Sequence, residues 1–289
     1  MNPAIILFTI RESIRKGILI FYFVMSTIII AVFAFGISHV PGDDSTITLF
    51  GAPLKFQGTV KMGSSMTEIN PVEILLLQLE KSSASMIMFV GAIALAGLIP
   101  SMLEKGTIDL FISKPVSRTN LLISRSVGSI LGVIGNLLYF ALGIWAVFGL
   151  KANVWAGGFL LSAVMVCLAF LFYASIVILP ALVFRNAMAA VLVALIFLFF
   201  SGAIETRELF LYKIWDNIVY HRILDCIYYA TPQLSAMLDQ ASNLIGVMPW
   251  QRMTDPDAGK FTIMPYVYSF CSSMGLYAIS FIYFRKQDF

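Results

Sequence analysis

Six long apolar stretches, separated by polar ones, limit how this chain of 289 residues can fold. A helix that crosses a bilayer needs about 20 mostly apolar residues, and each stretch comes close to or exceeds that length. Only 12% of the residues are charged, against about a quarter in soluble domains, which excludes a soluble globular protein. The sequence predicts an all-α integral membrane protein with one transmembrane domain over residues 1–289 and spans at 17–38, 84–103, 121–150, 156–184, 187–204 and 263–284.

The residues before and within the first apolar stretch indicate a membrane-surface helix followed by a retained span. A signal-peptide core has about 7–15 apolar residues, so the stretch at 17–38 is too long for one. Before it, a Pro at position 3 favours a helix start. That helix would be amphipathic and lie on the membrane surface, although a polar leader that only obeys the positive-inside rule would carry the same charges. These charged residues are Arg11, Glu12, Arg15 and Lys16.

The basic residues predict the orientation of the spans. One side of the predicted bundle holds ten of the nineteen Lys and Arg residues but only four of the sixteen Asp and Glu residues. Positive charge near the ends of spans marks the cytoplasmic side, so both termini are predicted to be inside. The ten residues are Arg11, Arg15, Lys16, Lys105, Lys114, Arg118, Arg125, Arg185, Arg285 and Lys286.

Two long segments, 39–83 and 205–261, are then extracytoplasmic. The first is predicted to contain short strands at Thr46–Phe50 and Thr59–Met62, and a helix at Pro71–Glu80 that leads into the second span. The second segment predicts two amphipathic helices that are either re-entrant or lie on the outer face. One of them carries Leu211, Trp215, Ile218 and Val219, and the other begins at Thr231-Pro232.

The predicted spans lack the chemistry of several kinds of membrane protein. Their interiors hold no Asp, Glu, Lys, Arg or His, which ion-coupled carriers need, so an autonomous secondary transporter is not expected. Ser162 and Ser175 have no membrane-embedded base to activate them, and we interpret them as packing residues. We therefore predict no catalytic residue.

Signals for bound cofactors are missing as well. There is no GxxxxGK[ST] motif for ATP and no basic run for nucleic acid. The three cysteines are far apart, and the 14 methionines are scattered without a Met-x-x-Met or Cys-His cluster that would suit copper. We expect no metal, no cofactor and no nucleic acid on this chain.

The third span begins with small residues at a spacing that favours close helix contacts. Gly128 and Gly132 form a GxxxG pattern, and Asn136 follows one turn later. Glycines at this spacing let two helix backbones approach, and an Asn can hydrogen-bond across the contact. The pattern predicts helix packing, either within one subunit, which we favour, or at a dimer interface.

The polar break at 104–125 carries mostly positive charge and separates the second span from the third. A short helix is predicted from Glu104 to Ser113, because a residue before a proline, here Lys114, is pushed out of the helical region. Ser117 or Thr119 can cap the next helix. A basic loop that only fixes orientation is the simpler alternative, but a small helix between two spans is also suited to receive a partner protein.

The order of residues in this break is distinctive. An acidic-basic pair and Gly-Thr are followed by an apolar run and a basic end around a proline: Glu104, Lys105, Gly106, Thr107, Ile108, Leu110, Phe111, Ile112, Lys114, Pro115, Val116, Ser117 and Arg118. This string resembles the loop between the second and third spans of ABC-2 type ABC transporter permeases, and most of all the branch described as multi-copper enzyme maturation permeases. The predicted spans agree with that family over nearly the whole chain.

The resemblance implies a function and a set of partners. The chain would be the permease subunit of an ABC exporter in the cell (inner) membrane of a prokaryote, forming the substrate path as a homodimer or heterodimer with a second permease subunit. ATP and Mg would bind a separate cytoplasmic ABC ATPase. An extracytoplasmic accessory protein is a further candidate partner, besides the lipid bilayer. A membrane scaffold without a transport path is the main alternative, and a neutral channel is the third.

The same resemblance assigns docking residues for the ATPase. The short helix would be the coupling helix, with Ile108, Phe111 and Ile112 as the apolar contact and Gly106 allowing close approach. Glu104, Lys105, Thr107 and Arg118 complete this predicted surface. The N-terminal helix, through Arg11, Glu12 and Arg15, would make the second contact.

Overall fold

The computed structural model describes residues 3–40, 43–53, 59–62, 65–68, 71–101, 117–208, 211–215, 217–246 and 260–286. Six of the described helices are long and apolar enough to cross a membrane, which confirms the predicted all-α fold with six spans. These helices are α2 (Ile18–Gly36), α3 (Pro71–Ser101), α5 (Arg118–Ala152), α6 (Gly157–Phe184), α7 (Ala187–Glu205) and α12 (Met264–Lys286).

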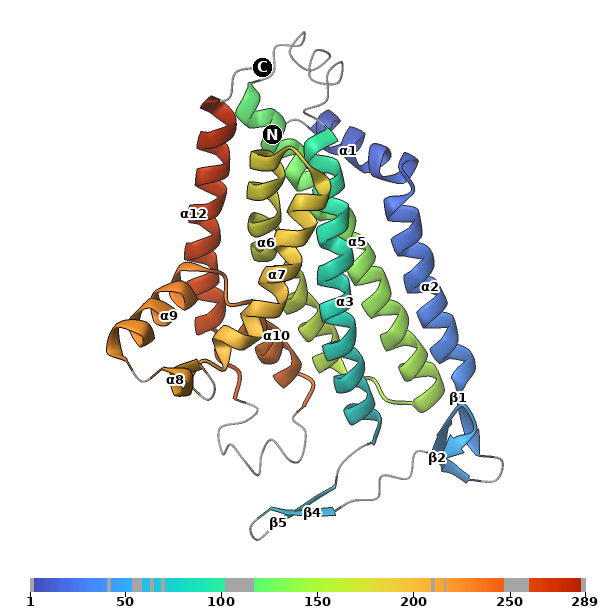
Figure 1. Cartoon of the computed structure of the whole chain (residues 1–289). Helices are drawn as coiled ribbons and strands as arrows, with labels where there is room; N and C mark the ends of the chain where they lie inside the picture. The colour runs from blue at the N-terminus through green and yellow to red at the C-terminus, as the bar shows by residue number, and fades with distance from the viewer. Residues whose placement is uncertain are drawn as a thin grey trace.

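Helix α6 forms the centre of the bundle and packs against α3, α5, α7 and α12 (Figure 1). Its residues are apolar all round, and a helix without a polar face is stable only when neighbours surround it. The side chains of Phe170 and Tyr173 are almost fully buried, and the Tyr173 hydroxyl donates a 3.0 Å hydrogen bond to the Ala194 carbonyl of α7. Four of the spans, α3, α5, α7 and α12, are therefore arranged around α6, and α2 packs on α5.

The predicted N-terminal helix is present as α1 (Pro3–Arg15), which lies at one end of the bundle and packs against α5 (Figure 1). Gly17 separates α1 from α2 with a φ of 75°, a left-handed conformation that glycine adopts without steric penalty. The chain thus turns sharply into the first span. The end of α12 lies at the same end of the bundle, which we call the α1 end.

Short strands lie at the opposite end, which we call the strand end (Figure 1). Strands β1 (Ile37–Val40), β2 (Asp43–Leu49) and β3 (Ala52–Pro53) form one antiparallel sheet, and β4 (Thr59–Met62) pairs with β5 (Ser65–Glu68). The predicted strand at 59–62 is confirmed. The strand predicted at 46–50 starts earlier, at Asp43, and ends before Phe50, whose φ of 51° belongs to the turn into β3.

The polar segment before the second span does not end where the sequence suggested. The predicted helix at Pro71–Glu80 and the second span are one continuous helix, α3, because no Gly or Pro interrupts the chain between Pro71 and Gly91. The third span, α5, begins where the sequence suggested: Ser117 caps it, and the Ser117 side chain accepts a 3.3 Å hydrogen bond from the Asn120 backbone N–H.

The segment after α7 contains three described helices: α8 (Leu211–Ile214), α9 (Ile218–Ala230) and α10 (Leu234–Asn243). The single amphipathic helix predicted across Leu211 and Val219 is wrong, because the Asn217 side chain accepts a 2.8 Å hydrogen bond from Val219 N–H and starts a new helix there. Helix α10 packs among α3, α6, α7 and α12 and buries Leu234 and Met237. Helix α10 is therefore part of the interior of the bundle.

Candidate functional site

A buried ion pair joins three helices at the α1 end. Arg125 of α5 is 0% exposed, and its Nη2 lies 2.8 Å from Glu12 Oε2 of α1. The same nitrogen donates to the Leu98 carbonyl and to Ser101 Oγ in the last turns of α3, at 3.3 Å each. Ser101 Oγ in turn donates to Glu12 Oε1 at 3.1 Å. We call Glu12 and Arg125 the α1-end pair.

This pair corrects the expectation that no charged residue lies inside a span. The sequence placed Arg125 at the edge of the polar break, but α5 starts at Arg118, so Arg125 lies two turns inside a helix. An arginine cannot lose its proton in a protein, so its burial requires a counter-ion. Glu12 supplies one, although the two residues are far apart in the sequence.

Glu12 remains ionised in this setting. Burial by itself raises the pKa of this carboxyl, but the hydrogen bond from Lys16 and the charges of Arg125 and Lys16 outweigh it, and the pKa falls below its ordinary value. Lys16 Nζ lies 2.9 Å from Glu12 Oε1. The carboxylate therefore binds two cations at once, one buried and one near the surface.

The polar break starts and ends at this junction, because α3 ends at Ser101 and α5 begins at Arg118. The predicted coupling residues Glu104, Lys105, Gly106, Thr107, Ile108, Phe111 and Ile112 lie outside the described residues, and Arg118 is the first residue of α5. In α1, Arg11 and Arg15 are exposed, whereas Glu12 turns inward to Arg125. Of the three α1 residues assigned to docking, the two arginines are thus the ones on the surface.

The small residues of α5 lie against α1 and α2 of the same chain. A Cβ added to Gly128 would stand 2.9 Å from Thr9 Cβ and 3.0 Å from the Ile6 carbonyl oxygen, and one added to Gly132 would stand 3.1 Å from Leu19 Cδ1. One turn further, Asn136 Nδ2 donates a 2.9 Å hydrogen bond to Ser26 Oγ. These contacts are packing within one subunit.

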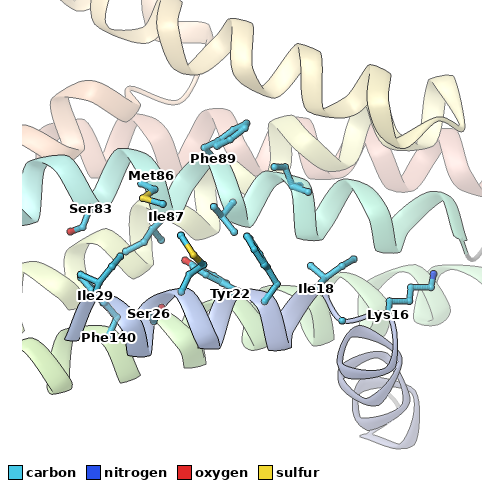
Figure 2. Close-up of a pocket in the computed structure, with 15 residues that line it drawn as sticks. Lys16, Ile18, Tyr22, Ser26, Ile29, Ser83, Met86, Ile87, Phe89 and Phe140 are labelled. Atoms are coloured by element: carbon cyan, nitrogen blue, oxygen red, sulfur yellow. The ribbon is translucent and has the colours of Figure 1, made fainter. Parts of the chain in front are cut away.

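A groove of about 510 Å³ lies between α2 and α3 (Figure 2). Its walls are mostly apolar, with Phe21, Met25 and Ile29 from α2, and Met86 and Phe89 from α3. Lys16 stands at the α1 end of the groove, and Ser83 stands near Ile29 at the other end. This volume is in the range of small-molecule sites, about 300–1,000 Å³.

A second buried charged residue, Glu80, lies one turn beyond Ser83 on α3. It is 5% exposed, and its Oε1 accepts a 2.9 Å hydrogen bond from Ser162 Oγ of α6. The sequence placed Glu80 in the polar outer segment, which its burial between α3 and α6 corrects, whereas Ser162 takes part in the packing of α6 on α3 as interpreted. The apolar run from Ile74 to Leu79, which continues into the span without a helix breaker, was the signal that α3 carries Glu80 into the bundle.

A different ion pair holds the helices after α7. Arg207 Nε lies 2.7 Å from Asp225 Oδ1 of α9, and the Tyr212 hydroxyl donates to the same oxygen at 2.7 Å. The Arg207 guanidinium also lies 3.9 Å from the centre of the Tyr228 ring. Hydrogen bonds from Tyr212 and Arg207 lower the pKa of Asp225. We call Arg207 and Asp225 the strand-end pair.

The arrangement of the described residues is that of a helical membrane bundle with a polar junction at one end and an apolar groove along one side. Comparison with curated proteins gives no match. The sequence profile of the family described as ABC-2 family transporter protein matches residues 4–288, nearly the whole chain. The match concerns the family and does not single out the multi-copper maturation branch. This multi-pass membrane protein belongs to the ABC-2 family of transporter proteins.

Proposed function

We propose that the chain works as the permease of an ABC exporter and that residues 102–116, together with α1, transmit movement from a separate cytoplasmic ATPase. Family membership makes the chain a membrane permease subunit of an ABC transporter. The observation that supports the coupling is the α1-end pair, because it joins α1, α3 and α5 close to the end of α3 and the start of α5. Export is the direction that the resemblance at residues 104–118 supports.

The junction is suited to move as one body. The α1-end pair, the Ser101 hydroxyl and the contact of Gly128 with α1 are short and mostly shielded from solvent, so a displacement of one helix would carry the others along. Close-packed interiors transmit strain because they compress little. A push on residues 102–116 would therefore tilt α3 and α5 together. It would also move α2 through the short turn at Gly17.

Movement of α2 and α3 would change the groove between them. These two helices pack lightly on each other, whereas α3 packs closely on α6 and α2 packs on α5. The groove can thus widen or close without breaking the core around α6. This placement supports a transport path rather than a scaffold. As the resemblance implies, a second permease subunit would complete the path.

The orientation that this coupling needs has the α1 end in the cytoplasm. Cys226 of α9 is exposed at the strand end, and Cys271 of α12 is also exposed. In a Cys271→Ser background, Cys226 should react with a membrane-impermeant thiol reagent added to intact cells. A cysteine at position 15 (Arg15→Cys) in a chain without the other exposed thiols should react only after the membrane is opened. Labelling of that site in intact cells would reverse the orientation.

The coupling proposal is tested by binding and ATP turnover of a co-expressed ATPase. Phe111→Ala removes an apolar side chain that the resemblance places in the docking groove, where burial contributes roughly 1.5–3 kcal/mol. We expect ATPase affinity to fall about tenfold or more, since 1.4 kcal/mol corresponds to a factor of ten.

Lys105→Ala is the matched control within the same segment. A charge at the rim of an interface contributes under about 1 kcal/mol, so this variant should change mainly the salt dependence of binding. Both variants are compared at equal amounts in the membrane. If Phe111→Ala binds and stimulates the ATPase like the unchanged chain, residues 104–113 are not the docking element. A chain that never stimulates an ATPase would support the scaffold alternative.

A further inference from the structure

We propose that the groove between α2 and α3 holds one acyl chain of an anionic phospholipid, whose phosphate head group binds at Lys16. This inference concerns what fills the groove, and it depends neither on export nor on coupling to an ATPase. Two observations carry it: an apolar groove that opens toward the surrounding bilayer, and an excess of positive charge at the α1 end of that groove.

The groove faces the bilayer and is about as long as one leaflet is thick. Phe21, Met86 and Ile93 line it and are exposed, so it opens on the outside of the bundle, where lipid lies. Along α2 its walls run from Ile18 to Ile29, or about 16 Å at 1.5 Å per residue. Half of the hydrocarbon core of a bilayer is about 15 Å thick. An acyl chain that enters at the α1 end would therefore contact the groove along most of its length.

The junction at the α1 end of the groove keeps one positive charge in excess. Lys16 and Arg125 both bind Glu12, so two cations share a single carboxylate. Arg125 is fully buried, whereas 39% of the Lys16 side chain is exposed, so the excess charge is accessible at Lys16. An ammonium group has three N–H donors, and Glu12 Oε1 accepts from only one of them. Lys16 can therefore also donate to a phosphate.

Lys16 is the charged residue that lines the groove, and it stands at the end where the lipid head group would lie (Figure 2). Arg11 and Arg15 of α1 are exposed as well, and they add positive charge to the same helix. Anionic lipids attract basic residues beside a membrane, with about 1 kcal/mol for each Lys or Arg near the surface. The distribution of charge thus favours an anionic head group over a neutral one.

The start of α2 adds to the positive potential at this end. Gly17 is the N-cap of α2, and no side chain among the described residues caps the helix there. The N-terminal end of a helix carries partial positive charge and presents backbone N–H groups that bind anions. Gly17 and Ile18 line the groove next to Lys16, so a phosphate in this position would lie close to both the ammonium group and the helix end.

The other candidate occupants match fewer of these features. A free phosphate would leave the apolar walls uncovered. Two copies of the chain that meet symmetrically through this face would bring two basic α1 ends together, because such an interface pairs a surface with itself. Lipid tails are as apolar as the walls of the groove, so any tail can fill it and selectivity has to come from the head group. Preference for an anionic head group is therefore the signature of the site.

The test is native mass spectrometry of the full chain released from mixed micelles that contain equal amounts of phosphatidylglycerol and phosphatidylcholine with the same acyl chains. We expect one phosphatidylglycerol to be retained per chain, about tenfold more often than phosphatidylcholine, because only the former carries a net negative charge. Equal retention of the two lipids would show a groove that accepts any acyl chain and would overturn the proposal.

Lys16→Gln should lower retention of phosphatidylglycerol about fivefold and leave that of phosphatidylcholine unchanged, since the variant removes one charge near the membrane surface. Lys286→Gln is the matched control, because it removes the same charge at the α1 end from α12, which does not line the groove. Unchanged retention in Lys16→Gln, or an equal loss in both variants, would contradict a site at Lys16.

Val90→Trp tests the apolar part of the site, because Val90 lines the groove and a larger side chain would fill it. Retention of both lipids should fall. Leu192→Trp, which adds the same ring to an exposed position of α7, should leave retention unchanged. The melting temperature of each variant shows whether it is folded. Unchanged retention in a folded Val90→Trp would place the lipid elsewhere and overturn the proposal.

The same spectra separate the lipid from the other occupants. Inorganic phosphate added in tenfold molar excess over the lipid should not displace phosphatidylglycerol, and displacement would assign the site to a free anion. A dimer that Val90→Trp dissociates while retention of phosphatidylglycerol stays unchanged would make the groove a contact between copies. Either result would overturn the proposal. No ATPase is present, so a failure here is distinct from a failure of the Phe111→Ala experiment.

Discussion

The α1-end pair and the strand-end pair are both single Arg–carboxylate contacts, but they sit in opposite environments. The side chains of Arg125 and Glu12 are 0% and 16% exposed, whereas those of Arg207 and Asp225 are 9% and 39% exposed. The first pair joins three helices of the bundle, and the second holds α9 beside the end of α7. The same kind of ion pair therefore links three helices of the bundle at one end and attaches a peripheral helix at the other.

The difference in burial determines how much the loss of each pair can change the free energy of unfolding. Two ions buried together are costly to desolvate, and removing one of them is strongly destabilising because the other stays buried without a partner. An exposed pair is screened by water and contributes little either way. Stability should thus depend strongly on the α1 end and weakly on the strand-end pair. This difference is consistent with the proposal that the ATPase moves the permease from the α1 end.

The largest effect is expected from Glu12→Gln. This variant leaves the fully buried Arg125 without its counter-ion, and losses of roughly 3–5 kcal/mol are typical of such changes. The free energy of unfolding of the purified chain in mixed micelles measures it. Lys16→Gln is the control on the same helix, and it should cost under about 1 kcal/mol because the lysine is near the surface. Similar losses in the two variants would refute the special role of the α1-end pair.

A smaller effect is expected from adding one methyl group to α5. Gly128→Ala would place a carbon 2.9 Å from Thr9 Cβ and 3.0 Å from the Ile6 carbonyl, and overpacking of this kind costs roughly 1–3 kcal/mol. Gly135→Ala is the matched control, since a Cβ there meets nothing within 4 Å. Thermal unfolding of the two variants should differ clearly. If both are neutral, α1 is not tightly docked on α5.

The strand-end pair should tolerate mutation better. Arg207→Gln removes a contact to a carboxylate that water also reaches, so we expect a loss under about 1 kcal/mol. Because this contact helps to hold α9 beside the end of α7, limited proteolysis near residues 206–217 should become faster even though the melting temperature hardly changes. A loss of unfolding free energy as large as that of Glu12→Gln would contradict the expected difference between the two ion pairs.

The smallest effect is the acid sensitivity of the strand-end pair. The pKa of Asp225 is lowered by hydrogen bonds from Tyr212 and Arg207, so its contribution is present above the ordinary aspartate pKa of 3.8 and is lost as the pH falls through the lowered value. The small difference in melting temperature between the unchanged chain and Asp225→Asn should therefore shrink as the pH falls from 6 towards 3. A difference that grows on acidification would contradict this sign.

Local features of the fold could be predicted from the sequence because they depend on short stretches of chain. Apolar length indicated the six spans, and Ser117, one of the two capping residues expected together with Thr119, caps the start of α5. The break before α9 was readable in principle, since Asn217 is a strong capping residue, but the apolar spacing from Leu211 to Val219 suggested one helix.

The charged residues of the site could not be placed in the same way. Arg125 and Glu80 each lie near the end of an apolar stretch, where a polar residue is usually outside the membrane. Their partners, Glu12 and Ser162, are more than eighty residues distant in the sequence, so only the packing of α1 on α5 and of α3 on α6 brings them together. The groove has the same origin, because it results from where α2 and α3 diverge.

The position of α10 has a consequence for the biosynthesis of the protein. Helices α3, α6 and α7 are synthesised before residues 234–243, yet Leu234 and Met237 of α10 fill the space among them. Helix α12 then secures α10, because Ser269 Oγ accepts a 2.8 Å hydrogen bond from Gln233 N–H and the Tyr266 hydroxyl donates one of 2.8 Å to the Met237 carbonyl. All six spans must therefore be synthesised before the bundle is complete, and a chain that stops after α7 lacks the α10 side chains that fill this part of its interior.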